Sequence, residues 1–179
     1  GWLIPGNFRD DYRPPFTGCS NLSKVTLGSG FTKLPKDTFR DLPNLRYVTV
    51  TSSLRDIDSE GFANCSQLKS VTGADSVRKI DSSAFLNCTS LESFEGFSSV
   101  TNIGESAFSG SGLTGEISLP NVSHIGSKSF QGCKNIVSFS ASRLSDLGIY
   151  SFDGCDSLVK CDISGEVTID ELKKFIVFV

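Results

Sequence analysis

The sequence repeats a phenylalanine at a nearly constant spacing. The seven members of this series lie 23, 23, 23, 23, 22 and 22 residues apart. They are Phe16, Phe39, Phe62, Phe85, Phe108, Phe130 and Phe152. Aliphatic residues recur at fixed offsets after them, such as Leu22, Leu45 and Leu68 six positions later. Several apolar columns held in register over such a period indicate stacked structural units, which is the pattern of a solenoid.

A single unit of this repeat is too small to fold alone. It offers about six apolar side chains, each worth roughly 1.5–3 kcal/mol when fully buried, whereas ordering the chain costs about 1.5 kcal/mol for each residue. Stacked units bury one another's apolar faces, so their stability comes from contacts between neighbours. The repeat therefore predicts one array over residues 16–164, built from about seven units of 22–23 residues.

Patterns within a unit predict a strand, a turn, a second short extended piece and a final turn. Segments 45–50 and 136–141 alternate inward apolar residues with polar ones, as a half-buried strand does. Segment 81–86 places polar capping residues before a helix-like turn that buries the phenylalanine. Neighbouring strands would pair in parallel about 4.8 Å apart. We therefore expect an α/β repeat solenoid with a parallel β-ladder.

The motif Ile-x-x-x-Ala-Phe-x-x-Cys-x-x-Leu-x-x-Val runs through the repeats, as in residues 80–94, where Phe94 takes the last place. It closely resembles the BspA-like, or Treponema pallidum type, leucine-rich repeat. The resemblance implies a right-handed parallel β-solenoid with short helical or irregular turns, and an adhesive role in surface proteins of host-associated bacteria and some protist parasites. The chain departs from the motif where Leu42 and Ser111 replace the cysteine and where Cys161 replaces an aliphatic residue.

Five of the six cysteines are explained by their place in the repeat. Each lies three residues after a phenylalanine of the series: Cys19, Cys65, Cys88, Cys133 and Cys155. The favoured interpretation is a column of small buried thiols. The alternative is a disulfide between neighbours such as Cys65 and Cys88, because the ladder spacing suits its geometry. No Cys-x-x-Cys pair is present, so a metal site is not expected.

Two other features invite functional interpretations that the repeat weakens. Four asparagines begin Asn-x-Ser/Thr sequons, namely Asn21, Asn64, Asn87 and Asn121. Three of them lie in the turn beside the phenylalanine, where asparagine suits the backbone geometry. The lone histidine, His124, lies in the second extended piece and is expected at the surface or an edge. We expect no catalytic residues, no cofactor and no enzymatic activity.

Composition excludes several classes of partner. The net charge is -3 and the 17 lysines and arginines are scattered, so nucleic-acid binding is not supported. No apolar run approaches the roughly 18 residues that span a bilayer, so no transmembrane segment is expected. The absence of methionine predicts that the chain is a processed or engineered part of a longer protein.

Outward positions of the predicted strands form the candidate partner-binding face. They are Lys24, Thr26, Tyr47, Thr49, Thr51, Ser70, Thr72, Ser93, Glu95, Phe97, Glu116, Ser118, Ser138, Ser140, Ser142, Lys160 and Asp162. Tyr47 and Phe97 are its aromatic anchors, and Tyr47 is the best candidate hot spot because tyrosine is enriched among hot spots. Serine and threonine are also what any exposed sheet surface uses, so composition alone does not require a ligand.

The two ends depart from the repeat. Residues 1–15 are expected to be a lead-in that partly covers the first unit, and residues 165–179 a C-terminal cap or the start of a following segment. We expect the apolar residues 175–179 to pack on the last unit.

The leading functional hypothesis is a recognition or adhesion module of a secreted or cell-surface protein, which binds a protein or a glycan through the solenoid. The alternative is a structural spacer that projects another domain without binding.

Overall fold

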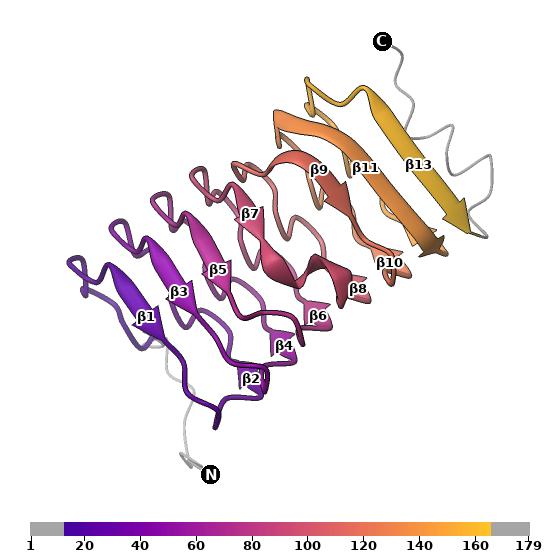
Figure 1. The fold of residues 1–179 in the computed structure, drawn as a ribbon. Coiled ribbons are helices and arrows are strands. Elements are labelled where there is room, and N and C mark those ends of the chain that lie inside the picture. Colours follow the sequence, from indigo (N-terminus) through magenta and orange to yellow (C-terminus); the bar gives the residue numbers. More distant parts are fainter. Residues whose placement is uncertain (1–12, 166–179) are drawn as a thin grey trace.

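The computed structural model describes residues 13–165, which form a single stack of coils (Figure 1). Seven strands lie along one face of the stack: β1 (Lys24–Thr26), β3 (Tyr47–Thr49), β5 (Ser70–Thr72), β7 (Ser93–Phe94), β9 (Thr114–Ser118), β11 (Asn135–Leu144) and β13 (Lys160–Gly165). Six two-residue strands lie along a second side: β2 (Lys33–Leu34), β4 (Asp56–Ile57), β6 (Lys79–Ile80), β8 (Asn102–Ile103), β10 (His124–Ile125) and β12 (Asp146–Leu147). One coil thus contributes one strand to each side.

All strand pairs are parallel and join residues at the same place in successive repeats. Val25 pairs with Val48, and Val48 with Val71. The two-residue strands form one continuous six-stranded sheet in the order β12-β10-β8-β6-β4-β2, whereas the face strands form a four-stranded sheet, β1-β3-β5-β7, and a three-stranded sheet, β13-β11-β9. The predicted parallel solenoid is confirmed. Its seven repeats correspond to six complete coils and a last, incomplete unit within the described residues.

The phenylalanine column forms a stack of rings through the interior. Neighbouring rings from Phe16 to Phe152 lie with centroids 5.0–5.6 Å apart and are nearly parallel. The central rings, from Phe39 to Phe130, are at most 1% exposed. Such offset stacking adds to the free energy gained by removing the rings from water. The predicted column is therefore the spine of the core.

The turn that carries each phenylalanine is irregular rather than helical, which is one of the two forms expected from the sequence. Residues two places before the ring have left-handed backbones, as at Glu60 (φ 58°) and Ser83 (φ 58°), and so do residues two places after it, as at Asn64 (φ 61°). The backbone N–H of Phe62 donates to the carbonyl of Ala84 in the next coil at 2.8 Å. Short polar residues tolerate this conformation, which turns the peptide groups toward the next coil.

Helix is scarce throughout the described chain. Between residues 13 and 165 the only helix is the 3-10 helix η1 (Glu95–Ser98), so the helical part of the expected α/β class shrinks to four residues. Within the same residues no helix is long and apolar enough to cross a membrane. The expected roles of residues 1–12 and 166–179, including packing of residues 175–179, lie outside the described part of the chain.

Candidate functional site

The outward residues of the face strands lie in straight rows across the sheets. One row runs through Lys24, Tyr47, Ser70 and Ser93, and a second through Thr26, Thr49 and Thr72. On the three-stranded sheet the rows are Glu116, Ser138, Lys160 and Ser118, Ser140, Asp162. These residues and Thr51, Glu95 and Ser142 are exposed or half-buried. Parallel pairing therefore brings the predicted residues onto two neighbouring patches.

Hydroxyl groups bind one another along these rows. The Oγ1 of Thr72 donates to the Oγ1 of Thr49 at 3.4 Å, and the Oγ of Ser140 donates to the Oγ of Ser118 at 3.2 Å. The serine and threonine side chains are short, so a ligand can reach their hydroxyl groups close to the backbone. The face offers hydrogen bonds over most of its length but little apolar area.

Phe97 was expected to point outward, and that expectation is wrong. Its ring is only 9% exposed and contacts the rings of Phe94 and Phe108 edge to face, with centroids 5.2 Å and 5.3 Å away. A Cβ atom at Gly96 would lie 2.6 Å from the carbonyl oxygen of Ala74, so this position needs glycine. The chain turns into η1 after Phe94, and the turn rotates Phe97 into the core.

The helix η1 also explains why the face has two sheets. The helix begins at Glu95, directly after β7, whereas β1, β3 and β5 each continue for a third residue at the equivalent position. Strand β7 is the last strand of its sheet and does not pair with β9. Glu95 remains exposed, and its Oε2 accepts a 2.8 Å hydrogen bond from the backbone N–H of Gly73. The predicted binding face is therefore interrupted after β7, where the carboxylate of Glu95 binds the backbone and the ring of Phe97 is buried.

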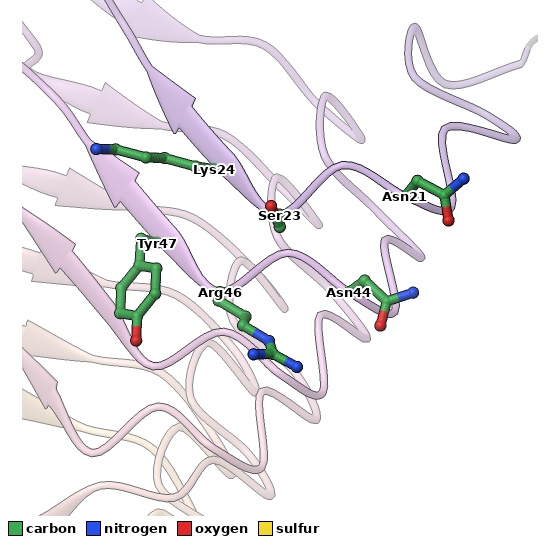
Figure 2. Close-up of a pocket in the computed structure, with 6 residues that line it drawn as sticks. All are labelled: Asn21, Ser23, Lys24, Asn44, Arg46 and Tyr47. Atoms are coloured by element: carbon green, nitrogen blue, oxygen red, sulfur yellow. The ribbon is translucent and has the colours of Figure 1, made fainter.

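A hollow of about 580 Å³ opens beside the N-terminal end of the face (Figure 2). Its walls come from equivalent positions of the first two coils: Asn21 and Asn44, Ser23 and Arg46, Lys24 and Tyr47. Figure 2 shows Arg46 between Tyr47 and Asn44. Sequence reasoning found only Lys24 and Tyr47, because the other four residues precede the strands and are not part of their alternation.

A smaller hollow of about 140 Å³ lies on the three-stranded sheet. Its lining residues are Ser118, Pro120, Ser140, Ala141, Ser142, Asp162 and Ser164. Four of them, Ser118, Ser140, Ser142 and Asp162, were predicted as face residues, and the only charged side chain among the seven is Asp162. The two hollows thus differ in charge as well as in volume, since the larger one is lined by Lys24 and Arg46 and the smaller one by Asp162.

Four of the five repeat cysteines form a column of free, buried thiols, as the favoured interpretation expected, whereas Cys19 was expected in that column and is exposed. Cys65, Cys88, Cys133 and Cys155 are buried, and each Sγ donates to the carbonyl of the phenylalanine one coil back, at 2.9–3.1 Å. Burial raises the pKa of the Cys65 thiol from 9.0 to about 12 and that of Cys133 to about 11. These thiols are therefore protonated and structural, since the nucleophile is the thiolate. Cys19 and Cys161 are exposed.

The sequons and the histidine also have structural partners. The Nδ2 of Asn64 donates to Oδ1 of Asp41 at 2.7 Å, and the Nδ2 of Asn87 donates to Oδ1 of Asn64 at 3.0 Å. The nitrogen that a glycan would modify is thus engaged between coils. His124 lies at the surface, as expected, with its Nδ1 2.5 Å from Oδ2 of Asp146. Within residues 13–165 no three His, Cys, Asp or Glu residues are grouped as metal ligands.

Comparison with known proteins agrees with this repeat geometry. The family model of the BspA type leucine-rich repeat region matches residues 13–114 and 113–176, in six copies. The chain belongs to the BspA-type leucine-rich repeat family. No curated protein sequence matches it. Membership suggests a repeat-based recognition or adhesion module of a family that is typically secreted or surface-located and generally non-enzymatic.

Two solved structures of leucine-rich repeat proteins resemble the BspA-type fold described here. The first is the leucine-rich repeat protein of T. pallidum, with a TM-score of 0.70 and 25% identity over 85% of this chain and 81% of that chain. The second is a leucine-rich repeat protein from Bacteroides ovatus, with a TM-score of 0.50 and 16% identity over 84% of this chain and 63% of that chain. The latter likeness concerns the fold alone.

Proposed function

We propose that this chain is a non-enzymatic recognition or adhesion module of a secreted or cell-surface protein. It binds a protein or a glycan through the outward face of the strands from β1 to β13. The observation that carries the proposal is the contrast within each strand. Inward side chains such as Val48 and Val71 are at most 1% exposed, whereas the outward rows are exposed or half-buried.

Tyr47 gives this face its main anchor. Its side chain is 46% exposed and lines the larger hollow together with Lys24 and Arg46. Tyrosine supplies a large contact area at a low cost in conformational entropy. With Phe97 buried, Tyr47 is the one aromatic side chain among the predicted face residues that a partner can reach.

Repetition of the face suits weak, multivalent binding. The row Thr26, Thr49 and Thr72 presents a hydroxyl group at three successive coils, and linked weak contacts raise the apparent affinity without any new contact. The test therefore couples the purified chain to beads at high density and measures retention on host-matrix proteins, arrayed glycans and whole cells. Binding to at least one of these surfaces is expected. Absence of binding to all of them would contradict the proposal and favour the spacer.

Substitutions in the face locate the binding. Thr49→Arg and Thr49→Glu both place a long side chain at the middle of β3 and have opposite charges. Both are expected to weaken retention, because they obstruct the face whatever the charge of the ligand. Thr32→Arg and Thr32→Glu are the matched controls, since Thr32 is exposed and lies outside the face, directly before β2. Equal retention of all four variants would show that binding occurs elsewhere.

A further inference from the structure

The geometry points to an anion subsite in the hollow of the first two coils, and we propose that it takes an acidic sugar, with a carboxylate or sulfate group held by Arg46. This subsite rests on the proposed function, because it gives a ligand class to one end of the recognition face. The hollow has a volume of about 580 Å³, within the range of about 300–1,000 Å³ that small-ligand sites occupy. It has room for a short stretch of an oligosaccharide.

The two cations of the hollow have no carboxylate partner among residues 13–165. Elsewhere in the described chain Lys33 pairs with Asp58 at 3.0 Å and Lys79 pairs with Asp81 at 3.0 Å. Lys24 and Arg46 make no such ion pair. A planar guanidinium binds a carboxylate or sulfate through two parallel hydrogen bonds, so Arg46 is the side chain suited to fix the anion.

Charge on the exposed face changes sign along the solenoid. The first three coils present Lys24, Arg46 and Lys69 on the strands and the positions directly before them, and no carboxylate among those positions. The next two coils present Glu92, Glu95 and Glu116. An acidic ligand is therefore attracted to the first three coils and repelled by the two coils that follow them.

The remaining walls favour a sugar over an acidic peptide. The exposed Tyr47 ring offers a flat apolar surface, while Asn21, Asn44 and Ser23 offer amides and a hydroxyl. A sugar presents this same combination of an apolar ring face and hydroxyl groups at its rim. The Nδ2 of Asn44 already donates to the carbonyl of Ser20 at 2.9 Å, which leaves its Oδ1 as an acceptor for a sugar hydroxyl.

Two main-chain donors of the hollow are already used. The backbone N–H groups of Arg46 and Tyr47 both donate to the carbonyl of Ser23, at 2.9 Å and 3.2 Å. A peptide that adds to a sheet derives its affinity from such groups, and here they are taken by the neighbouring coil. Arg46 and Tyr47 are therefore left with their side chains to contact a ligand, as in sugar binding.

The test compares four fluorescently labelled probes of equal length with the full chain by fluorescence polarisation. They are a heparin-derived sulfated octasaccharide, a galacturonate octasaccharide, uncharged maltooctaose and an octapeptide of glutamate. At least one acidic sugar is expected to bind about tenfold or more tightly than both maltooctaose and the peptide. The sulfated and carboxylated probes distinguish the two anions. Binding should weaken as salt rises from low to high ionic strength.

Substitution of Arg46 completes the test. Arg46→Gln is expected to weaken the acidic sugar about tenfold, with an unchanged urea midpoint, because Arg46 is exposed. Arg78→Gln is the matched control, since Arg78 is exposed and directly precedes β6 on the second side, and its binding should stay within about twofold of the original.

Three outcomes overturn the subsite. They are equal binding of the glutamate peptide, equal binding of maltooctaose, and an Arg46→Gln variant that binds like Arg78→Gln. In each case the bead assay decides the proposed function separately: beads that still adhere through the Thr49 surface leave the recognition module standing without this ligand. Beads that adhere to nothing remove the recognition module as well.

Discussion

The phenylalanine side of each coil and its strand face obey different rules. On the phenylalanine side, equivalent positions of successive coils hold the same ring, and the rings stack 5.0–5.6 Å apart. On the face, the equivalent positions of β1, β3, β5 and β7 hold Lys24, Tyr47, Ser70 and Ser93. An interior side chain packs against the equivalent side chains of the neighbouring coils, so these residues must have the same shape. A face side chain contacts solvent, so its residue type can vary from coil to coil. Stability and recognition therefore occupy different columns.

The largest effect on stability is expected from the middle of the ring column. Phe85→Ala removes a fully buried ring that stacks on Phe62 and Phe108, so the free energy of unfolding should fall by about 3–5 kcal/mol. Urea denaturation measures it. If the variant does not fold, Phe85→Leu should fold and show a smaller loss. A fall of less than about 1 kcal/mol for Phe85→Ala would contradict the role of the ring column.

The next largest effect is expected in the column of Gly104, Gly126 and Gly148, where each glycine lies against the backbone of the previous coil. A Cβ atom at Gly148 would lie 2.1 Å from the backbone nitrogen of Ser127 in the previous coil, so Gly148→Ala forces neighbouring coils apart and should cost about 1–3 kcal/mol. Gly28→Ala is the control, since nothing lies within 4 Å of its Cβ position. Equal urea midpoints for the two variants would mean that the coils are not packed as closely as described.

Buried thiols should make the solenoid less stable in alkaline solution. Burial raises the pKa of Cys65 to about 12 and that of Cys88 well above its ordinary value. Below the thiol pKa of the unfolded chain, near 9.0, this difference in pKa contributes its full stabilisation of the folded state. The stabilisation is lost as the pH rises from that value through the higher pKa of the folded state. At pH 10 the loss should be about 1 kcal/mol for each thiol.

Lysines and tyrosines also titrate at this pH, so a variant isolates the thiols. Between pH 8 and pH 10 the urea midpoint of Cys65→Ala/Cys88→Ala should fall less than that of the original chain. Identical falls for the two proteins would show that these thiols do not titrate on unfolding in the way their burial predicts.

The interior could be predicted from the sequence because its signal is periodic. The spacing from Phe16 to Phe152 gave the coil length, and a constant coil length dictates which strands pair and in which register. The buried cysteine column and the surface position of His124 followed from the same offsets. The boundaries at residues 15 and 165 remain predictions.

The parts that were missed depend on contacts between coils rather than on spacing. Phe97 continues the alternation of β7 in the sequence, but Gly96 lies against the carbonyl of Ala74 and the chain leaves the sheet. For the turns the sequence left a helical and an irregular form open, because aspartate, asparagine and serine also cap helices, whereas here such residues adopt left-handed backbones. The hollow needs Ser23 beside Arg46 on the next coil, a combination that no single repeat reveals.

Substitution of Tyr47 is expected to have the smallest effect on stability and the largest effect on adhesion. This substitution tests most directly whether recognition by the strand face is separate from stabilisation by the phenylalanine side. Tyr47 and Tyr150 are similarly exposed, at 46% and 50%, but Tyr150 lies in a phenylalanine turn. The measurement is bead retention of Tyr47→Ala and Tyr150→Ala on the surface that the original chain binds, together with their urea midpoints. Tyr47→Ala should lose most of its retention while its free energy of unfolding changes by less than about 0.5 kcal/mol, and Tyr150→Ala should retain binding. Unchanged retention of Tyr47→Ala, or equal losses in both variants, would contradict recognition through the strand face.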